Sequence, residues 1–177
     1  MKRIAVAVLF VFCLSLLASA QQDKSKRPSP PAQAKCQFSD GKTITVDYSS
    51  PRMKGRKIFG DLVPYGQVWR TGANEATTFV TTAGLTADGR DIPAGNYTIF
   101  TVPEQSKWTL IVNKKTGEWG IPYKYESDEL VRVPMSVSKT SGPVENFTIS
   151  FDQGGSSCNL KISWEETEAS VQFSEKK

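Results

Sequence analysis

The chain has 177 residues, of which 38% are hydrophobic and 23% are charged. This balance is typical of one folded domain rather than of a disordered chain or a multi-span membrane protein. The 22 basic and 18 acidic residues give a net charge of only +4, and there is no histidine. The charge is too small to indicate a nucleic-acid partner, and the missing histidine excludes a histidine-ligated metal site, a Ser-His-Asp triad and a Cys-His pair.

The first 20 residues have the pattern of a secretory signal peptide. Lys2 and Arg3 give a basic start, residues 4–17 form an apolar run, and residues 18–20 (Ala-Ser-Ala) match the small-residue motif before a cleavage site. The run is short for a bilayer span, which needs about 20 apolar residues. We therefore expect export to the periplasm or the cell exterior, and no transmembrane segment once residues 1–20 are removed. A retained N-terminal anchor is the alternative.

Residues 21–34 (QQDKSKRPSPPAQA) contain three prolines and show no apolar periodicity. This composition predicts a flexible, proline-rich linker between the signal and a single domain over residues 35–174. Three basic side chains of the linker offer contacts to an anionic lipid or polymer, although a solvated tail is the simpler interpretation. They belong to Lys24, Lys26 and Arg27.

Most of the remaining chain alternates between apolar and polar residues, as strands with one buried face do. The alternating segments are residues 36–38, 44–48, 131–137, 147–151, 160–164 and 171–173. Residues 97–102 and 108–112 are apolar on both faces, which favours central strands, and residues 77–83 predict another strand. Pro134 indicates a sheet edge or a bulge, because proline donates no ladder hydrogen bond. Residues 165–168 (Glu-Glu-Thr-Glu) are expected to form only a charged turn.

These eight or nine short strands, with no convincing helix between them, predict an all-β fold. The architecture that we expect is an antiparallel β-sandwich, jelly-roll-like, with one long ordered loop. The order of the strands does not follow from the sequence.

Two cysteines follow the expected signal, Cys36 and Cys158. Each shares the inward-facing parity of its strand, Cys36 with Phe38 and Cys158 with Leu160. An oxidising compartment and this parity permit a disulfide between the first and the penultimate strand. They equally permit two separate buried thiols, so both alternatives stay open.

Residues 49–76 interrupt the alternation for about 28 positions, an uncommon length for a loop in a compact domain. The segment contains apolar side chains that need burial, so we expect an ordered loop that packs against the sandwich. Between residues 52 and 70 five basic residues stand against Asp61 alone, for a local net charge of +4. The loop is therefore the candidate functional segment.

The candidate ligand-binding residues of this segment combine a guanidinium, an amide, a carboxylate and two aromatic rings. They are Tyr65, Trp69, Arg70, Asn74 and Glu75. An arginine fork suits a carboxylate or phosphate, and tyrosine and tryptophan offer flat faces for stacking on sugars or rings. In the competing structural interpretation Arg70 and Glu75 form a buried ion pair, Asn74 caps a turn and Trp69 fills the core.

Three functions remain open from the sequence. The first is a non-catalytic binding or accessory module for a polar or anionic small molecule or glycan. The second is a hydrolase of an envelope component or glycan that uses Glu75 and Arg70, and the third is a structural or assembly protein. Because no calcium loop or phosphate-binding glycine loop is present, we expect no metal and no cofactor. Catalytic residues and oligomeric state are not predicted.

Three stretches of the sequence resemble an exported bacterial family. They are residues 55–77 (GRKIFGDLVPYGQVWRTGANEAT), 92–103 (IPAGNYTIFTVP) and 107–120 (KWTLIVNKKTGEWG). The family is described only as a domain of unknown function, number 2911, and the resemblance covers residues 35–174. It implies export and a β-rich domain, and it supplies no activity, substrate or catalytic residue.

Overall fold

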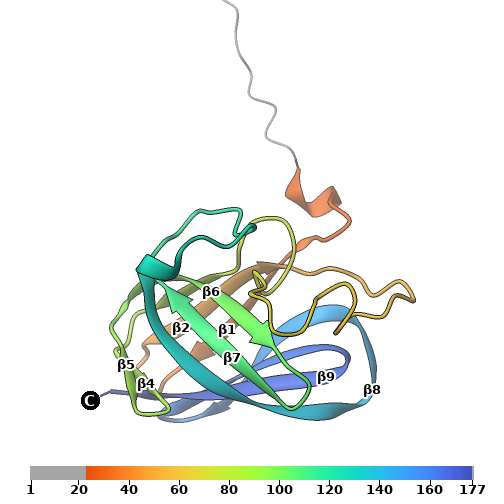
Figure 1. The fold of residues 1–177 in the computed structure, drawn as a ribbon. Helices are drawn as coiled ribbons and strands as arrows, with labels where there is room; N and C mark the ends of the chain where they lie inside the picture. The colour runs from red at the N-terminus through yellow and green to blue at the C-terminus, as the bar shows by residue number, and fades with distance from the viewer. Residues whose placement is uncertain (1–22, 177) are drawn as a thin grey trace, which may run out of the picture.

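The computed structural model describes residues 23–176, so the expected signal over residues 1–20 lies outside the described residues. The prediction of an all-β antiparallel fold is confirmed: nine strands form one sheet in the order β1-β2-β3-β6-β7-β8-β9-β4-β5 (Figure 1). The strands are β1 (Pro31–Gln37), β2 (Thr43–Ser49), β3 (Thr78–Thr81), β4 (Leu85–Ala87), β5 (Arg90–Ile92), β6 (Gly95–Pro103), β7 (Lys107–Asn113), β8 (Glu129–Gly154) and β9 (Ser157–Glu175). Two short 3-10 helices are η1 (Lys24–Lys26) and η2 (Glu126–Asp128).

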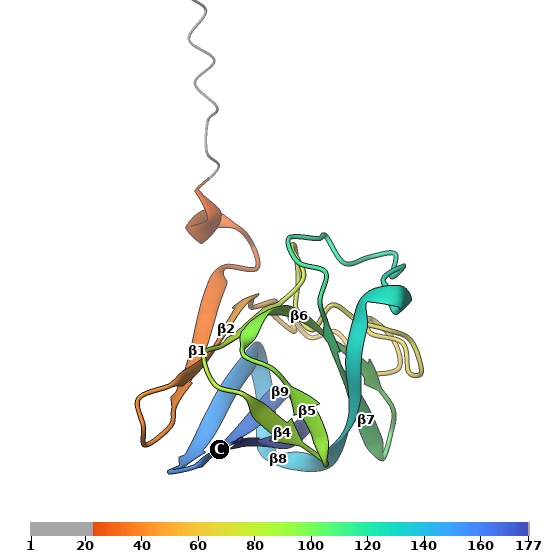
Figure 2. The same ribbon diagram turned by 90° about the vertical axis from the view of Figure 1, so that its left-hand side faces the viewer.

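The long β8–β9 hairpin turns this single sheet into a sandwich-like arrangement. The first part of β8 pairs with β7, and the rest pairs with β9. The hairpin then crosses below the remaining sheet (Figures 1 and 2). Its far end meets the turn between β1 and β2, where the Ser39 N–H donates to the Gly155 carbonyl at 3.1 Å. The core lies between the two layers.

The apolar faces predicted from the alternation line this core. Its fully buried side chains include Ile44, Phe79, Ile99, Leu110, Leu160 and Phe173. Cys36 of β1 and Cys158 of β9 are also buried, and a disulfide joins them with a Cα–Cα distance of 6.1 Å. The bridge ties an edge strand of one layer to the hairpin of the other.

Residues 31–34, expected to belong to a flexible linker, instead form the first half of β1. Pro31 pairs with Ser49 and Ala34 pairs with Val46. Proline is tolerated here because β1 is an edge strand and Pro31 is its first residue. Before β1, Asp23 caps η1 by accepting a hydrogen bond from the Ser25 N–H at 3.0 Å.

The hairpin also departs from the expected charged turn at residues 165–168. These residues continue β9, and Glu165 takes a left-handed φ of +56° where the register with β8 shifts. A bulge of this kind bends both strands without ending them. Pro134 lies in β8 opposite Thr109 of β7. Pairing of β8 with β9 begins only at Ser136, so no strand of the described chain pairs with Pro134 on its other side, where a proline cannot donate a hydrogen bond.

Candidate functional site

Four of the five predicted binding residues line hollows of the surface, and they do not all line the same one. Tyr65 lines a hollow of about 810 Å³, Trp69 and Arg70 line one of about 290 Å³, and Glu75 lines one of about 170 Å³. Asn74 lines none of the three. The structure therefore brings Trp69 and Arg70 together and separates the other candidates from them.

Trp69 is a structural anchor of the loop as well as a wall of its hollow. Its backbone pairs with Thr101 of β6, with N–O distances of 2.8 and 2.9 Å. Its indole N–H donates to the Gly72 carbonyl at 3.1 Å, and its ring stacks on Trp164 with the centroids 6.1 Å apart. Phe147 meets the same ring edge-on at 5.1 Å. The ring is buried on the core side and forms the floor of the hollow.

Asn74 and Glu75 hold the N-terminal segment against the loop. Arg27 donates to both Glu75 carboxylate oxygens, at 3.0 and 2.8 Å, and the Lys24 ammonium lies 3.3 Å from the same group. The Asn74 amide donates to the Ser29 carbonyl at 3.1 Å. A hydrogen bond from its own backbone N–H, followed by those from Arg27 and Lys24, lowers the pKa of Glu75 to about 2. The ion pair between Arg70 and Glu75 that belonged to the competing structural interpretation does not form.

Arg70 is a partly buried cation that lacks a carboxylate partner within 4.0 Å among residues 23–176. Its guanidinium lies over the Trp119 ring, 5.0 Å from the centroid, and donates to the Trp119 carbonyl at 3.4 Å. Its Nε is buried and finds no hydrogen-bond acceptor in the described part of the chain. Burial lowers the pKa of Arg70, while the charge of Glu75 acts in the opposite direction.

The hollow that contains Arg70, called here the Arg70 hollow, combines apolar walls with two cations. Its apolar walls come from Leu62, Val63, Trp69, Ile121 and Trp164. Arg56 and Arg70 supply the positive charge, and Ser29 of the N-terminal segment closes one side. The sequence analysis counted Arg56 within the basic run but missed Ile121, because nothing in the sequence places the loop after β7 beside residues 56–63.

A shallower hollow of about 380 Å³ adjoins the Arg70 hollow through Ser29 and Arg56 and adds Arg52 and Lys54. The Arg52 guanidinium donates to the Ser50 carbonyl at 3.0 Å, and Arg56 donates to the Arg52 carbonyl at 2.6 Å. These acceptors are neutral. Within residues 23–176 none of these three cations lies within ion-pair distance of a carboxylate. These three loop residues are therefore not neutralised by an ion pair within the described part of the chain.

The larger hollow beside Tyr65 has no such charge preference. Lys57 and Lys139 line it together with Glu165 and Glu166. Glu165 is already engaged, because its carboxylate accepts the N–H groups of Ile58 and Phe59 at 3.2 and 3.3 Å. The mixed charges give this hollow no evident selectivity for an ion.

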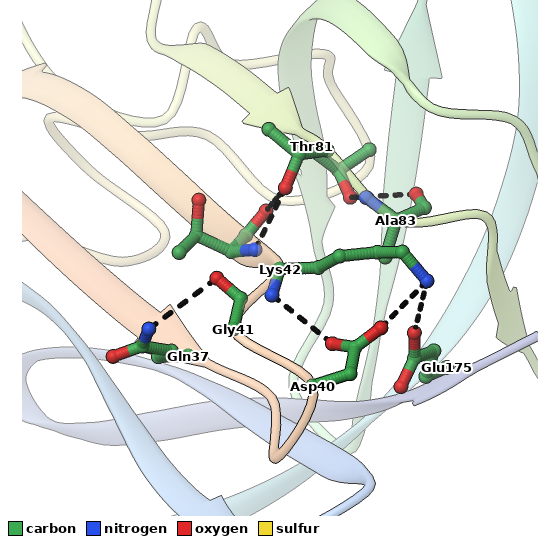
Figure 3. A network of polar contacts seen from close by, with 9 residues as sticks. Gln37, Asp40, Gly41, Lys42, Thr81, Ala83 and Glu175 are labelled. Carbon is green, nitrogen blue, oxygen red and sulfur yellow. Dashed lines mark hydrogen bonds and ion pairs between the residues drawn. The ribbon is translucent and has the colours of Figure 1, made fainter.

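A further polar cluster lies at the turn between β1 and β2 (Figure 3). The Lys42 ammonium pairs with Asp40 at 2.6 Å and with Glu175 of β9 at 2.8 Å. The hydrogen bond from Lys42 lowers the pKa of Asp40 to about 2. Because every charge in the cluster has a partner, we interpret it as a structural contact between the turn and β9.

Residues 23–176 contain no group of three or more metal-binding side chains, and no helix among them is long and apolar enough to span a bilayer. Searches of curated proteins and of solved structures found no significant match. A family model described as a protein of unknown function, DUF2911, matches residues 29–173. This match covers most of the sheet and the whole of the loop that builds the Arg70 hollow, and the chain therefore belongs to the DUF2911 family.

Proposed function

We propose that the protein is an exported binding module that takes a small anion with an apolar part, of the monocarboxylate class, in the Arg70 hollow. The observation that carries the proposal is the partly buried Arg70 guanidinium, which has no carboxylate within 4.0 Å among the described residues. A partly buried cation without an ion-pair partner is unfavourable, and a carboxylate bound at the terminal nitrogens of the guanidinium would supply the opposite charge. Arginine presents a planar donor fork that suits this group.

The shape and lining of the hollow support a ligand with an apolar body. Trp69 and Trp164 form its floor, and Leu62 and Ile121 flank its mouth. Its volume of about 290 Å³ is close to the lower limit for small-molecule sites, which are mostly apolar with a few placed polar groups. A ring or a short aliphatic chain joined to one carboxylate fits this description.

Binding is better supported than hydrolysis. The hydrolase alternative needs Glu75 as an acid or base near Arg70, but the Glu75 carboxylate is held by Arg27 and Lys24. With its pKa lowered to about 2, it carries no proton to donate near neutral pH. Export is supported by the signal pattern of residues 1–20 and by the disulfide, which an oxidising compartment favours.

The test is calorimetric titration with benzoate and hexanoate against their neutral amides, benzamide and hexanamide. We expect the carboxylates to bind and to raise the melting temperature, and the amides to bind at least tenfold more weakly. Arg70→Gln should weaken carboxylate binding by about tenfold or more, because the charge-assisted hydrogen bonds are lost. Arg56→Gln, at the exposed rim, should have a smaller effect.

Arg90→Gln is the matched control, since Arg90 is an exposed cation on β5 whose side chain makes no hydrogen bond or ion pair among residues 23–176. It should leave carboxylate affinity unchanged. Equal affinity for acids and amides, or full affinity in a folded Arg70→Gln protein, would contradict the proposal. Circular dichroism and the melting temperature establish whether each variant is folded.

A further inference from the structure

The described residues expose four large hydrophobic side chains, and three of them gather at one place. Leu62 and Ile121 line the Arg70 hollow, and the Arg70 guanidinium lies over the ring of Trp119. These side chains are 46%, 47% and 55% exposed. Leu62 comes from the loop before β3 and the other two from the loop after β7, so the fold itself assembles the apolar group.

Cations surround this apolar group. Arg56 and Arg70 line the same hollow, and Arg52 and Lys54 line the adjoining one. Four carboxylates lie near them. Glu75 is paired with Arg27 and Lys24, and Glu118 is paired with Lys115 at 3.7 Å. Asp61 precedes Leu62 in the chain, and the Glu145 carboxylate accepts the Lys54 backbone N–H at 2.9 Å. Among the described residues, four cations without an ion-pair partner against two such carboxylates leave the surface positive.

The N-terminal segment adds charge at the same end of the molecule. Pro28 and Ser29 line the shallower cationic hollow, and η1 with Lys24 and Lys26 lies beside it in sequence. Both ribbon views place η1, the loop after β7 and the last part of the loop before β3 at one end, with the earlier part of that loop along the side and β4 and β5 at the other end (Figures 1 and 2). We call the surface formed by Leu62, Trp119, Ile121 and the cations Arg52, Lys54, Arg56 and Arg70 the loop-end surface.

We propose that the loop-end surface docks on a bilayer that contains anionic phospholipid. Leu62, Trp119 and Ile121 enter the interfacial region, and the surrounding cations face the lipid phosphates. Tryptophan favours the membrane–water interface because its ring is apolar and its N–H is polar. Basic residues near an anionic leaflet add electrostatic attraction. This docking goes beyond the binding of a small anion and does not depend on it.

A bilayer fits the surface better than an anionic polysaccharide does. A polysaccharide would satisfy the cations but would leave Leu62 and Ile121 against a polar chain. A lipid surface supplies negative charge and an apolar phase within a few ångströms of each other, which matches the arrangement of cations around exposed apolar side chains.

The experiment is co-sedimentation of the chain from Gln21 onward with vesicles of phosphatidylcholine, with and without about 30% phosphatidylglycerol. We expect binding to the anionic vesicles, at least tenfold weaker binding to the neutral ones, and a loss of binding at high salt because exposed charges are screened. Lys54→Gln should lower the partition coefficient about fivefold, and Trp119→Ser about tenfold. Arg90→Gln, at the opposite end, should have no effect.

Tryptophan fluorescence supplies a second measurement. Trp69, Trp108 and Trp164 are buried, whereas Trp119 is exposed, so a blue shift on addition of anionic vesicles would come from Trp119. The shift should disappear in Trp119→Phe, while that variant keeps most of its binding.

Equal binding to neutral and anionic vesicles would overturn the proposal, as would unchanged partitioning of both Lys54→Gln and Trp119→Ser. Binding to dextran sulfate without binding to vesicles would assign the surface to a polymer instead. Lys54 and Trp119 do not line the Arg70 hollow. These two variants therefore test membrane docking separately from small-anion binding, and either proposal can be contradicted while the other holds.

Discussion

At the scale of single residues, Glu75 shows how a group chosen for ligand chemistry can serve the chain itself. Its carboxylate accepts both hydrogen bonds from Arg27, whose side chain is only 20% exposed, and it also pairs with Lys24. Both hydrogen bonds come from one guanidinium nitrogen, Nη1, and charge-assisted hydrogen bonds of this kind are stronger than neutral ones. Glu75 thereby fastens the segment before β1 next to the Arg70 hollow.

Replacement of Glu75 by glutamine should lower the free energy of unfolding by about 1 kcal/mol at pH 7. The full change in pKa would imply more, but the Glu75 side chain is 43% exposed and solvent screens the pair. Because the folded-state pKa of about 2 lies below the ordinary value of 4.5, the ionised carboxylate stabilises the fold above pH 4.5. This contribution is lost as the pH falls from 4.5 toward 2.

The measurement is the difference in stability between the original protein and Glu75→Gln from pH 7 to pH 2.5, which isolates this one carboxylate from the other acids. The difference should shrink below pH 4.5. Arg27→Gln should produce a similar loss, and the double variant little more than either single one. A difference that stays constant with pH would show that the ion pair does not stabilise the fold.

At the scale of elements, the Arg70 hollow depends on how closely the loop after β7 approaches the end of the loop before β3. Gly120 makes this approach feasible. It has a left-handed φ of +89°, and a Cβ placed there would lie 2.9 Å from the Ala76 Cβ and 3.1 Å from the Arg70 Cβ. A side chain at this position would force the loop away from Arg70.

Gly120→Ala should therefore destabilise the protein by about 1–3 kcal/mol, through the strained φ and the crowded contact together. It should also displace Trp119 from the Arg70 guanidinium, which a change in Trp119 fluorescence would report. Gly117→Ala is the matched control, because Gly117 has a φ of +77° but no neighbour within 4 Å of the added Cβ. Equal losses in the two variants would mean that the close approach is unimportant.

The sequence predicted the strands well and the assembly of the site poorly, for physical reasons that differ. Alternation at Ile44 and Leu160 reflects a local geometry of period two, so it is visible in the chain itself. The meeting of Ile121 with Leu62, or of Arg27 with Glu75, depends on contacts between distant segments that no local pattern records. The packed loop over residues 49–76 was predictable from its apolar content, but the partners of its polar groups were not.

At the scale of the whole molecule, the sheet folds over itself through one continuous hairpin, β8–β9, rather than through two separate sheets. The hairpin reaches its partner layer by bending at Glu165, where the charged sequence had suggested a turn. Backbone hydrogen bonds then join the hairpin to the segment after β2, where the Phe147 N–H donates to the Pro51 carbonyl at 2.9 Å. The beginning of the loop over residues 49–76 is thus attached to the hairpin as well as to β2.

The disulfide adds a second link between the hairpin and the first strands, since it joins β1 to β9 across 122 positions of the chain. A cross-link over so long a loop restricts the unfolded chain, and its removal typically lowers stability by about 2–4 kcal/mol. Cys36→Ala combined with Cys158→Ala should show such a loss as a lower midpoint of guanidinium unfolding. The original protein unfolded in a reducing agent is the control, because it keeps both sulfur atoms and lacks only the bond. If reduction leaves the midpoint unchanged while the double alanine variant is destabilised, the loss comes from the small cavities and not from the cross-link.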